Sequence, residues 1–226
     1  MRILTEQLRI FEHDYTSMKK NILLLTACTI ISLSASAQIR MRDVFAQLPD
    51  SVLPYMTRNN RLDCIDFIEN GIEARVKNRF DQHVVLDKLT EDYLQLRTST
   101  SSYVEMKLVQ HGQDTVISVN RTYMGTTPDS EVRLYDSKWK MLCRLERPAV
   151  SEFMKLPVCD SVLTVKAATD TMQMIRQEAE FLPLIKASLS PSSTDLTWAL
   201  QTSEFTKTLK TDAEKYQQPV VRNLAQ

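Results

Sequence analysis

Few residues in this sequence combine a reactive side chain with the spacing that catalysis or metal binding requires. Downstream of residue 37 the histidines are His83 and His111, and neither lies at ligand spacing from another histidine or a cysteine. The chain contains only three glycines, which are Gly71, Gly112 and Gly125. Glycines this scattered cannot build a phosphate-binding loop or a nucleophile elbow, which argues against nucleotide binding and against an α/β-hydrolase triad.

Two groups of acidic residues lack the arrangement that their chemistry would need. Asp63, Asp66 and Glu69 share one face of an expected helix and have no glycine-containing calcium loop, so they indicate a solvated helix face. Glu91 and Asp92 are adjacent, so in a strand they would point to opposite faces and make a poor acid and base pair for glycan hydrolysis. The sequence therefore predicts no catalytic residue, no metal ligand and no cofactor.

A stripe of basic residues is the candidate binding surface. Arg75, Lys77 and Arg79 alternate along an expected strand at residues 72–80 and would share one face. An anionic ligand such as an acidic glycan would suit them. The simpler interpretation, which we prefer, is an exposed strand whose charges pair with acidic residues on a neighbour.

Residues 18–37 have the parts of a secretory signal peptide, with a basic start, an apolar run and an Ala-Ser-Ala cleavage motif. Cleavage between Ala37 and Gln38 would leave residues 38–226 as the mature chain. Residues 1–17 would then be an extension that comes from a start codon assigned too early. These features predict an exported protein, in the periplasm or on the surface of a Gram-negative cell.

The same segment also allows a lipid anchor. Leu-Thr-Ala-Cys ending at Cys28 fits a lipobox, and acylation there would attach the chain to a membrane. The apolar run before Cys28 is very short, and Ile30, Ile31 and Leu33 continue it past the cysteine, where lipoproteins usually turn polar. We therefore favour cleavage after Ala37, with membrane attachment only if Cys28 is acylated.

Charge and cysteine content restrict the class of partner further. The chain has 28 basic and 28 acidic residues, which argues against nucleic acid and against a general attraction to anionic membranes. Three cysteines remain after residue 37, which are Cys64, Cys143 and Cys159. An oxidising compartment would permit a disulfide, and Cys143 with Cys159 is the more local pairing. Cys64 lies among apolar residues of an expected helix and fits a core position.

Alternation of polar and apolar residues predicts a β-meander over residues 86–145. The alternating runs lie at 93–98, 103–108, 115–120 and 131–135, with a weaker run at 141–145. Polar turns join them, as in an antiparallel sheet with one buried face. Glu105 and Lys107 would lie on the face away from the core, because Val104, Met106 and Leu108 point inward.

Helical patterns flank this meander, at residues 41–48, 50–56, 61–70, 151–156 and 165–181. Residues 184–190 and 195–202 form a further pair of expected strands, and a capping box predicts a short helix from Thr211. The predicted fold class is α+β, a single domain over residues 38–226. In it a curved antiparallel sheet packs against the N-terminal helices and the 165–181 helix.

Several sequence blocks resemble a known protein family. They are Asp-Val-Phe at 43–45, Leu-Pro-Asp-Ser-Val-Leu-Pro-Tyr-Met-Thr at 48–57, Asn-Arg-Leu-Asp at 60–63, Leu-Thr-Glu-Asp-Tyr-Leu at 89–94 and Ala-Ser-Leu-Ser-Pro at 187–191. These blocks resemble a secreted Bacteroidales family called domain of unknown function 3256. The resemblance implies an exported protein of a Gram-negative gut or oral anaerobe. It transfers no catalytic residue.

The sequence favours a non-enzymatic envelope protein that binds another envelope protein or a glycan. The alternatives are a periplasmic or surface hydrolase, and a lipid-anchored subunit of an outer-membrane assembly. A deep polar cleft that holds His83 or His111 beside a carboxylate or a cysteine would favour an enzyme. An exposed sheet face rimmed by Tyr103, Tyr123 or Trp139 would favour binding.

Overall fold

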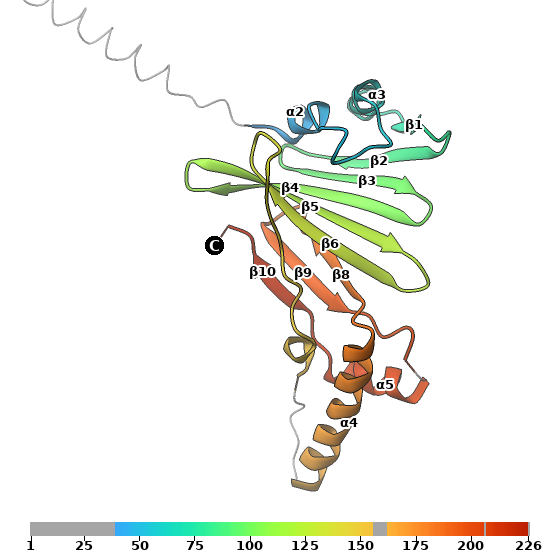
Figure 1. The fold of residues 1–226 in the computed structure, drawn as a ribbon, viewed down its shortest axis with the longest axis vertical. Helices are drawn as coiled ribbons and strands as arrows, with labels where there is room; N and C mark the ends of the chain where they lie inside the picture. The colour runs from blue at the N-terminus through green and yellow to red at the C-terminus, as the bar shows by residue number, and fades with distance from the viewer. Residues whose placement is uncertain (1–38, 156–161, 206, 226) are drawn as a thin grey trace, which may run out of the picture. The chain divides into compact units, whose positions relative to one another are not determined.

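The computed structural model is built around a seven-stranded antiparallel sheet whose strands follow one another in chain order (Figure 1). The strands are β1 (Arg75–Lys77), β2 (His83–Leu89), β3 (Tyr93–Ser99), β4 (Ser102–His111), β5 (Asp114–Met124), β6 (Pro128–Tyr135) and β7 (Met141–Arg144). Every neighbouring pair is antiparallel. The predicted meander and the α+β class with a curved sheet are confirmed.

The structure describes residues 39–155, 162–205 and 207–225. The predicted signal peptide, its cleavage between Ala37 and Gln38, the possible lipidation of Cys28, and Cys159 all lie outside these residues. None of the described helices combines the length and the apolar character that crossing a bilayer requires.

The N-terminal helices cover one face of the large sheet. They are α2 (Met41–Ala46) and α3 (Arg58–Glu69), and α3 lies over β1 and β2 (Figure 1). Phe45 and Leu53 are fully buried from the helical side, against Leu96 and Met106 from the strands. The inward positions that alternation assigns to β3 and β4 are confirmed, because Leu94, Leu96, Val104 and Met106 all belong to this first core.

The other face of the large sheet packs on a second, smaller sheet. Its strands are β8 (Ile185–Leu189), β9 (Asp195–Leu200) and β10 (Val220–Asn223), in the order β10-β9-β8. Strand β8 lies against β4, β5 and β6, and a second core forms there around Tyr93, Val132 and Trp198. The expectation of one buried face is therefore wrong for the middle of the meander, where both faces are covered.

The remaining helical elements lie beside the small sheet. They are the 3₁₀ turn η1 (Val150–Phe153), α4 (Val162–Phe181) and α5 (Lys207–Tyr216). Helix α4 contacts α5 and η1, and it reaches the second core through Ala179 (Figure 1). Three members of its predicted apolar stripe are buried, Ala168, Ile175 and Ala179, whereas Leu182 lies just past the helix and is exposed.

Local side-chain bonds explain where two predicted boundaries are wrong. Thr57 caps α3, since its hydroxyl accepts from the backbone N–H of Asn60 and the Asn60 side chain accepts from the Thr57 N–H. The helix therefore begins at Arg58, three residues before the predicted start at residue 61. The predicted strand at 72–80 is only β1, because the Asn78 side chain accepts the N–H groups of Phe80 and Gln82 and closes a turn.

Three predicted helical segments also differ. Residues 50–56 form turns, and the segment expected at 151–156 is the short η1 as far as the structure describes it. Helix α5 already includes Lys207, so Thr211 lies inside it and does not cap it.

Candidate binding surface

The three basic residues predicted as a binding stripe do not act as a free cationic patch. Arg75 and Lys77 lie on β1, and Arg79 lies in the turn after it. Arg75 pairs with Glu73 at an N···O distance of 2.7 Å, and Lys77 pairs with Asp81 at 3.9 Å. Arg79 pairs with Asp50 at 2.5 Å. Each charge is neutralised nearby, which favours the interpretation as an exposed strand.

Both histidines are exposed. His83 is the first residue of β2 and His111 the last of β4. In the described parts of the chain, no three His, Cys, Asp or Glu side chains come together in a way that could hold a metal ion. A hollow of about 440 Å³ beside α3 and the β2–β3 turn is lined by Arg40, Arg42 and Glu69 among others, and by no histidine or cysteine.

The cysteines have contrasting environments. Cys64 is buried in α3, and burial raises the pKa of its thiol to about 12, so it fits the predicted core position. Cys143 is exposed on β7. Because Cys159 lies outside the described residues, the disulfide between Cys143 and Cys159 stays a prediction.

A carboxylate lies buried between the two sheets. Glu105, on β4, is 5% exposed and accepts hydrogen bonds from the Tyr93 hydroxyl at 2.9 Å and from the Asn120 amide at 2.8 Å. The backbone N–H of Leu189 on β8 lies 3.4 Å from it, and Asn120 also donates to the carbonyl of Ala187. Burial raises the pKa of Glu105 and, together with that carboxylate, the pKa of Tyr93.

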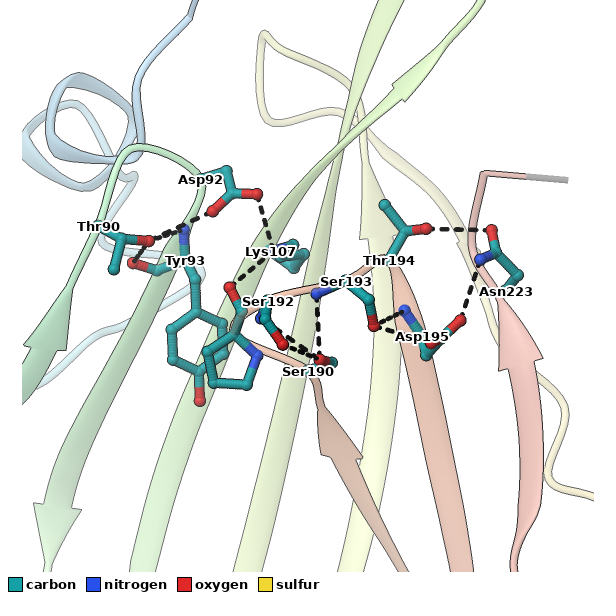
Figure 2. Close-up of polar contacts among 11 residues, drawn as sticks. Thr90, Asp92, Tyr93, Lys107, Ser190, Ser192, Ser193, Thr194, Asp195 and Asn223 are labelled. Atoms are coloured by element: carbon teal, nitrogen blue, oxygen red, sulfur yellow. Dashed lines mark hydrogen bonds and ion pairs between the residues drawn. The ribbon is translucent and has the colours of Figure 1, made fainter.

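A buried ammonium lies on the same face, two residues along β4. Lys107 is 2% exposed, and Figure 2 shows it between two partners from different parts of the chain. Its Nζ lies 2.7 Å from the Asp92 carboxylate and donates to the carbonyl of Pro191 at 3.2 Å. Lys107 thus connects the β2–β3 turn with the turn between β8 and β9.

Short polar side chains fix the β8–β9 turn that Lys107 contacts. The Ser190 hydroxyl accepts the N–H of Ser193 at 3.1 Å, and the Ser193 hydroxyl donates to Asp195 at 2.8 Å (Figure 2). The Asn223 amide on β10 donates to the other oxygen of Asp195. Glu105, Lys107 and this turn join the two sheets, and both ionisable groups are enclosed by protein, so the cluster is suited to holding structure and not to acid–base chemistry on a substrate.

Sequence reasoning missed this cluster because alternation gave Glu105 and Lys107 a solvent-facing position. The signal that could have revealed it lies elsewhere, in the alternating apolar residues of the second strand pair. Ile185, Ala187 and Leu189 share one face of β8, and such a face must be buried on something.

A second charged group lies on the first face, past the region that the helices cover. Exposure rises along β5 on this face, from Val119 (2%) through half-buried Arg121 to Tyr123 (52%). Arg121 is the cross-strand neighbour of Glu131 on β6, and Arg133 on β6 is the neighbour of Arg144 on β7. We call these four charged residues, Arg121, Glu131, Arg133 and Arg144, the arginine face.

One carboxylate organises the arginine face. The Glu131 side chain is 14% exposed. Its Oε1 accepts a hydrogen bond from Arg133 at 2.9 Å and forms an ion pair with Arg144, whose Nε lies 3.1 Å away. The hydrogen bond that Arg133 donates to Glu131 raises the pKa of Arg133. Arg121 has no ion-pair partner among the described residues. Three positive charges and one negative charge leave this surface electropositive.

Aromatic side chains lie at both ends of the arginine face. Tyr123 follows Arg121 by two residues and therefore shares its side of β5. At the other end, Trp139 contacts the ring of Tyr135, with ring centroids 5.6 Å apart. Two of the three aromatics expected to rim a binding face thus lie beside it. The third, Tyr103, is half-buried on the opposite face, as the cross-strand neighbour of Thr122.

Comparison with known proteins gives the chain a family. The sequence pattern of the family described as Protein of unknown function (DUF3256) matches residues 32–223. The chain belongs to this family. The resemblance based on the blocks from residue 43 to residue 191 is confirmed.

One solved structure is informative about the fold. It is a domain of an uncharacterised protein from Porphyromonas gingivalis W83, which is 21% identical to this chain and superposes with a TM-score of 0.59. The similarity covers 80% of this chain and 91% of that domain, and at this identity it supports the fold alone. No protein with a curated description matches the chain.

Proposed function

We propose that this DUF3256 protein is an exported, non-enzymatic binding module of the cell envelope, and that it binds a protein or a glycan through the arginine face. One observation carries the proposal. The described groups best suited to acid–base chemistry are enclosed between the sheets, whereas the arginine face presents uncompensated charge to solvent.

An enzyme needs its acid, base or nucleophile in contact with substrate. Glu105 and Lys107 are 5% and 2% exposed, and each is held by partners from both sheets. The exposed histidines, His83 and His111, lie at strand ends, and His111 has only Asp114 as its cross-strand neighbour in an exposed hairpin. These positions support binding over catalysis.

Export rests on the signal peptide predicted at residues 18–37 and on the secreted family that the sequence resembles. A lipid-anchored subunit is the alternative form of the same proposal, and it requires acylation at Cys28. In either form the arginine face would meet its ligand outside the cytoplasm.

The test is affinity capture from the native envelope with a C-terminally tagged full-length chain. The variant Arg121→Gln/Arg144→Gln removes two positive charges from the arginine face. The matched control is Arg97→Gln, an exposed arginine that pairs with Asp87 on the opposite face of the sheet.

The expected result is a stoichiometric partner, protein or glycan, that the wild type and the control retain and the double variant loses. Capture that both variants retain equally would contradict the proposed surface. A hydrolytic activity of the purified chain that depends on His83 or His111 would contradict the binding module itself.

A further inference from the structure

The geometry of the arginine face points to a particular ligand, and we infer that this face binds carboxylate-bearing sugar residues of an acidic glycan. The inference rests on the proposed function, since it names the ligand of the same surface. Three observations carry it, which are the bridging carboxylate, the unpaired arginine and the exposed tyrosine.

The bridging carboxylate fixes the positions of two guanidinium groups that could bind an anion. Glu131 is largely covered, and a single oxygen accepts a hydrogen bond from Arg133 and forms an ion pair with Arg144. A guanidinium has five N–H donors, so each arginine keeps further donors for a ligand. The side chains of Arg133 and Arg144 remain 40% and 61% exposed, so these donors can be reached. Arginines fixed in this way lose little freedom on binding.

The unpaired arginine supplies the charge that a ligand would neutralise. Arg121 lies directly across from Glu131 in the β5–β6 ladder, where an ion pair would ordinarily form. That carboxylate already serves Arg133 and Arg144, and Arg121 has no partner within the described part of the chain. A planar guanidinium matches a carboxylate through two parallel hydrogen bonds, which makes it the natural first contact.

The exposed tyrosine favours a sugar acid over a bare anion. Tyr123 is 52% exposed and lies two residues from Arg121 on the same side of β5, about 7 Å along the strand. An aromatic ring offers an apolar surface for the C–H groups of a sugar ring, while its hydroxyl stays in water. A uronic acid residue carries both groups, a ring for Tyr123 and a carboxylate for Arg121.

The experiment measures binding of defined oligosaccharides to the full mature chain by calorimetry. The probes are a galacturonate oligosaccharide, the same oligosaccharide with its carboxyl groups methyl-esterified, a sialylated oligosaccharide and inorganic phosphate. The ester is the matched control, because it keeps the ring and removes the charge.

We expect at least one acidic oligosaccharide to bind, and its affinity to fall about tenfold or more in Arg121→Gln, as for the loss of a charged hydrogen bond. The galacturonate ester and Tyr123→Ala should also bind more weakly, and Arg97→Gln should bind like the wild type. A cooperative urea unfolding transition for each variant would show that all of them fold. Affinity should also fall as salt is added.

Three results would overturn the inference: no binding of either acidic oligosaccharide, binding of galacturonate that its ester matches, or phosphate binding as tight as the sugar acids. If these occur while envelope capture still depends on Arg121 and Arg144, the binding module stands with a protein as its ligand. If capture also fails, the proposed function fails with it.

Discussion

The two faces of the large sheet are built from alternate residues of the same strands, yet along β4 they are buried by different chemistry. Toward the helices, β4 presents Val104, Met106 and Leu108, which join an apolar core. Toward the small sheet it presents Glu105 and Lys107, which are just as buried but held by hydrogen bonds and an ion pair. The alternation of polar and apolar residues assigns each side chain to a face of the sheet. It does not show whether other elements cover that face.

The two interfaces should therefore contribute differently to stability. Burial of apolar area stabilises by about 25 cal/mol per Å², whereas a satisfied internal hydrogen bond adds only about 1 kcal/mol net. The polar interface is also incompletely satisfied. Within the described residues, Ser118 Oγ, Asn120 Oδ1 and Trp198 Nε1 are buried without a hydrogen-bond partner. We expect the apolar face to dominate the free energy of unfolding.

The largest expected effect comes from the apolar face. Phe45→Ala removes a fully buried ring from the first core and should lower the free energy of unfolding by about 3–5 kcal/mol. Urea denaturation measures it. Phe80→Ala, at a ring that is 69% exposed, is the control and should change stability by less than about 0.5 kcal/mol. Similar losses of unfolding free energy for both variants would contradict the burial of Phe45 in a core.

The next effect tests the charge pair on the polar face. Asp92→Ala leaves the Lys107 ammonium buried with only the Pro191 carbonyl, and should cost about 2–3 kcal/mol. Lys107→Met keeps the volume and leaves Asp92, which is half-exposed, free to be hydrated, so it should cost about 1 kcal/mol or less. Equilibrium unfolding of both variants should show this asymmetry. A larger loss for Lys107→Met would mean that the pair itself stabilises the interface.

A smaller effect depends on pH. Burial raises the pKa of Glu105, so the folded chain holds a proton that the unfolded chain releases. This contribution to stability is complete below the ordinary pKa of 4.5 and is lost as the pH rises through the raised value. Urea midpoints from pH 4.5 to 8 should show the wild type losing stability relative to Glu105→Gln as the pH rises. A constant difference would place the carboxylate in a more hydrated site.

The smallest effect comes from the uncovered part of the polar face. Arg97 forms a bidentate pair with Asp87 at 2.7 and 2.6 Å, but its side chain is 56% exposed. Arg97→Gln should lower stability by no more than about 1 kcal/mol, because exposed pairs are well screened. Its effect should also shrink in high salt, measured by thermal unfolding. A loss of stability as large as that of Asp92→Ala would show that the size of the effect depends on charge pairing and not on burial.

Much of the fold could be predicted because it depends on local patterns. The inward positions of Leu94, Leu96 and Met106 follow from alternation alone, and the turns of the meander from polar residues between the runs. The burial of Glu105 and Lys107 could not be predicted, because it depends on a sheet that the chain supplies about eighty residues later. Lys107 and Pro191 are 84 positions apart.

The candidate site was less predictable for a related reason. Arg121, Glu131, Arg133 and Arg144 come together only through the registers of two strand pairs, and the β6–β7 pair contains an irregularity at Leu134 and Tyr135. The sequence also does not show where the helices stop covering the first face. It instead singled out Arg75, Lys77 and Arg79, whose acidic partners lie in segments before and after β1.

The position of the small sheet has a consequence for the order of folding. Strands β1 to β7 pair with their neighbours in the chain, so the contacts of the large sheet are local in sequence. Such contacts form quickly during folding. The contacts of Glu105 with Leu189 and of Lys107 with Pro191 close over 84 residues and must come later. Until the small sheet packs on it, this face of the large sheet carries charged and amide groups that water can solvate. An unfinished sheet with these groups on its open face should resist aggregation better than one with only apolar side chains there.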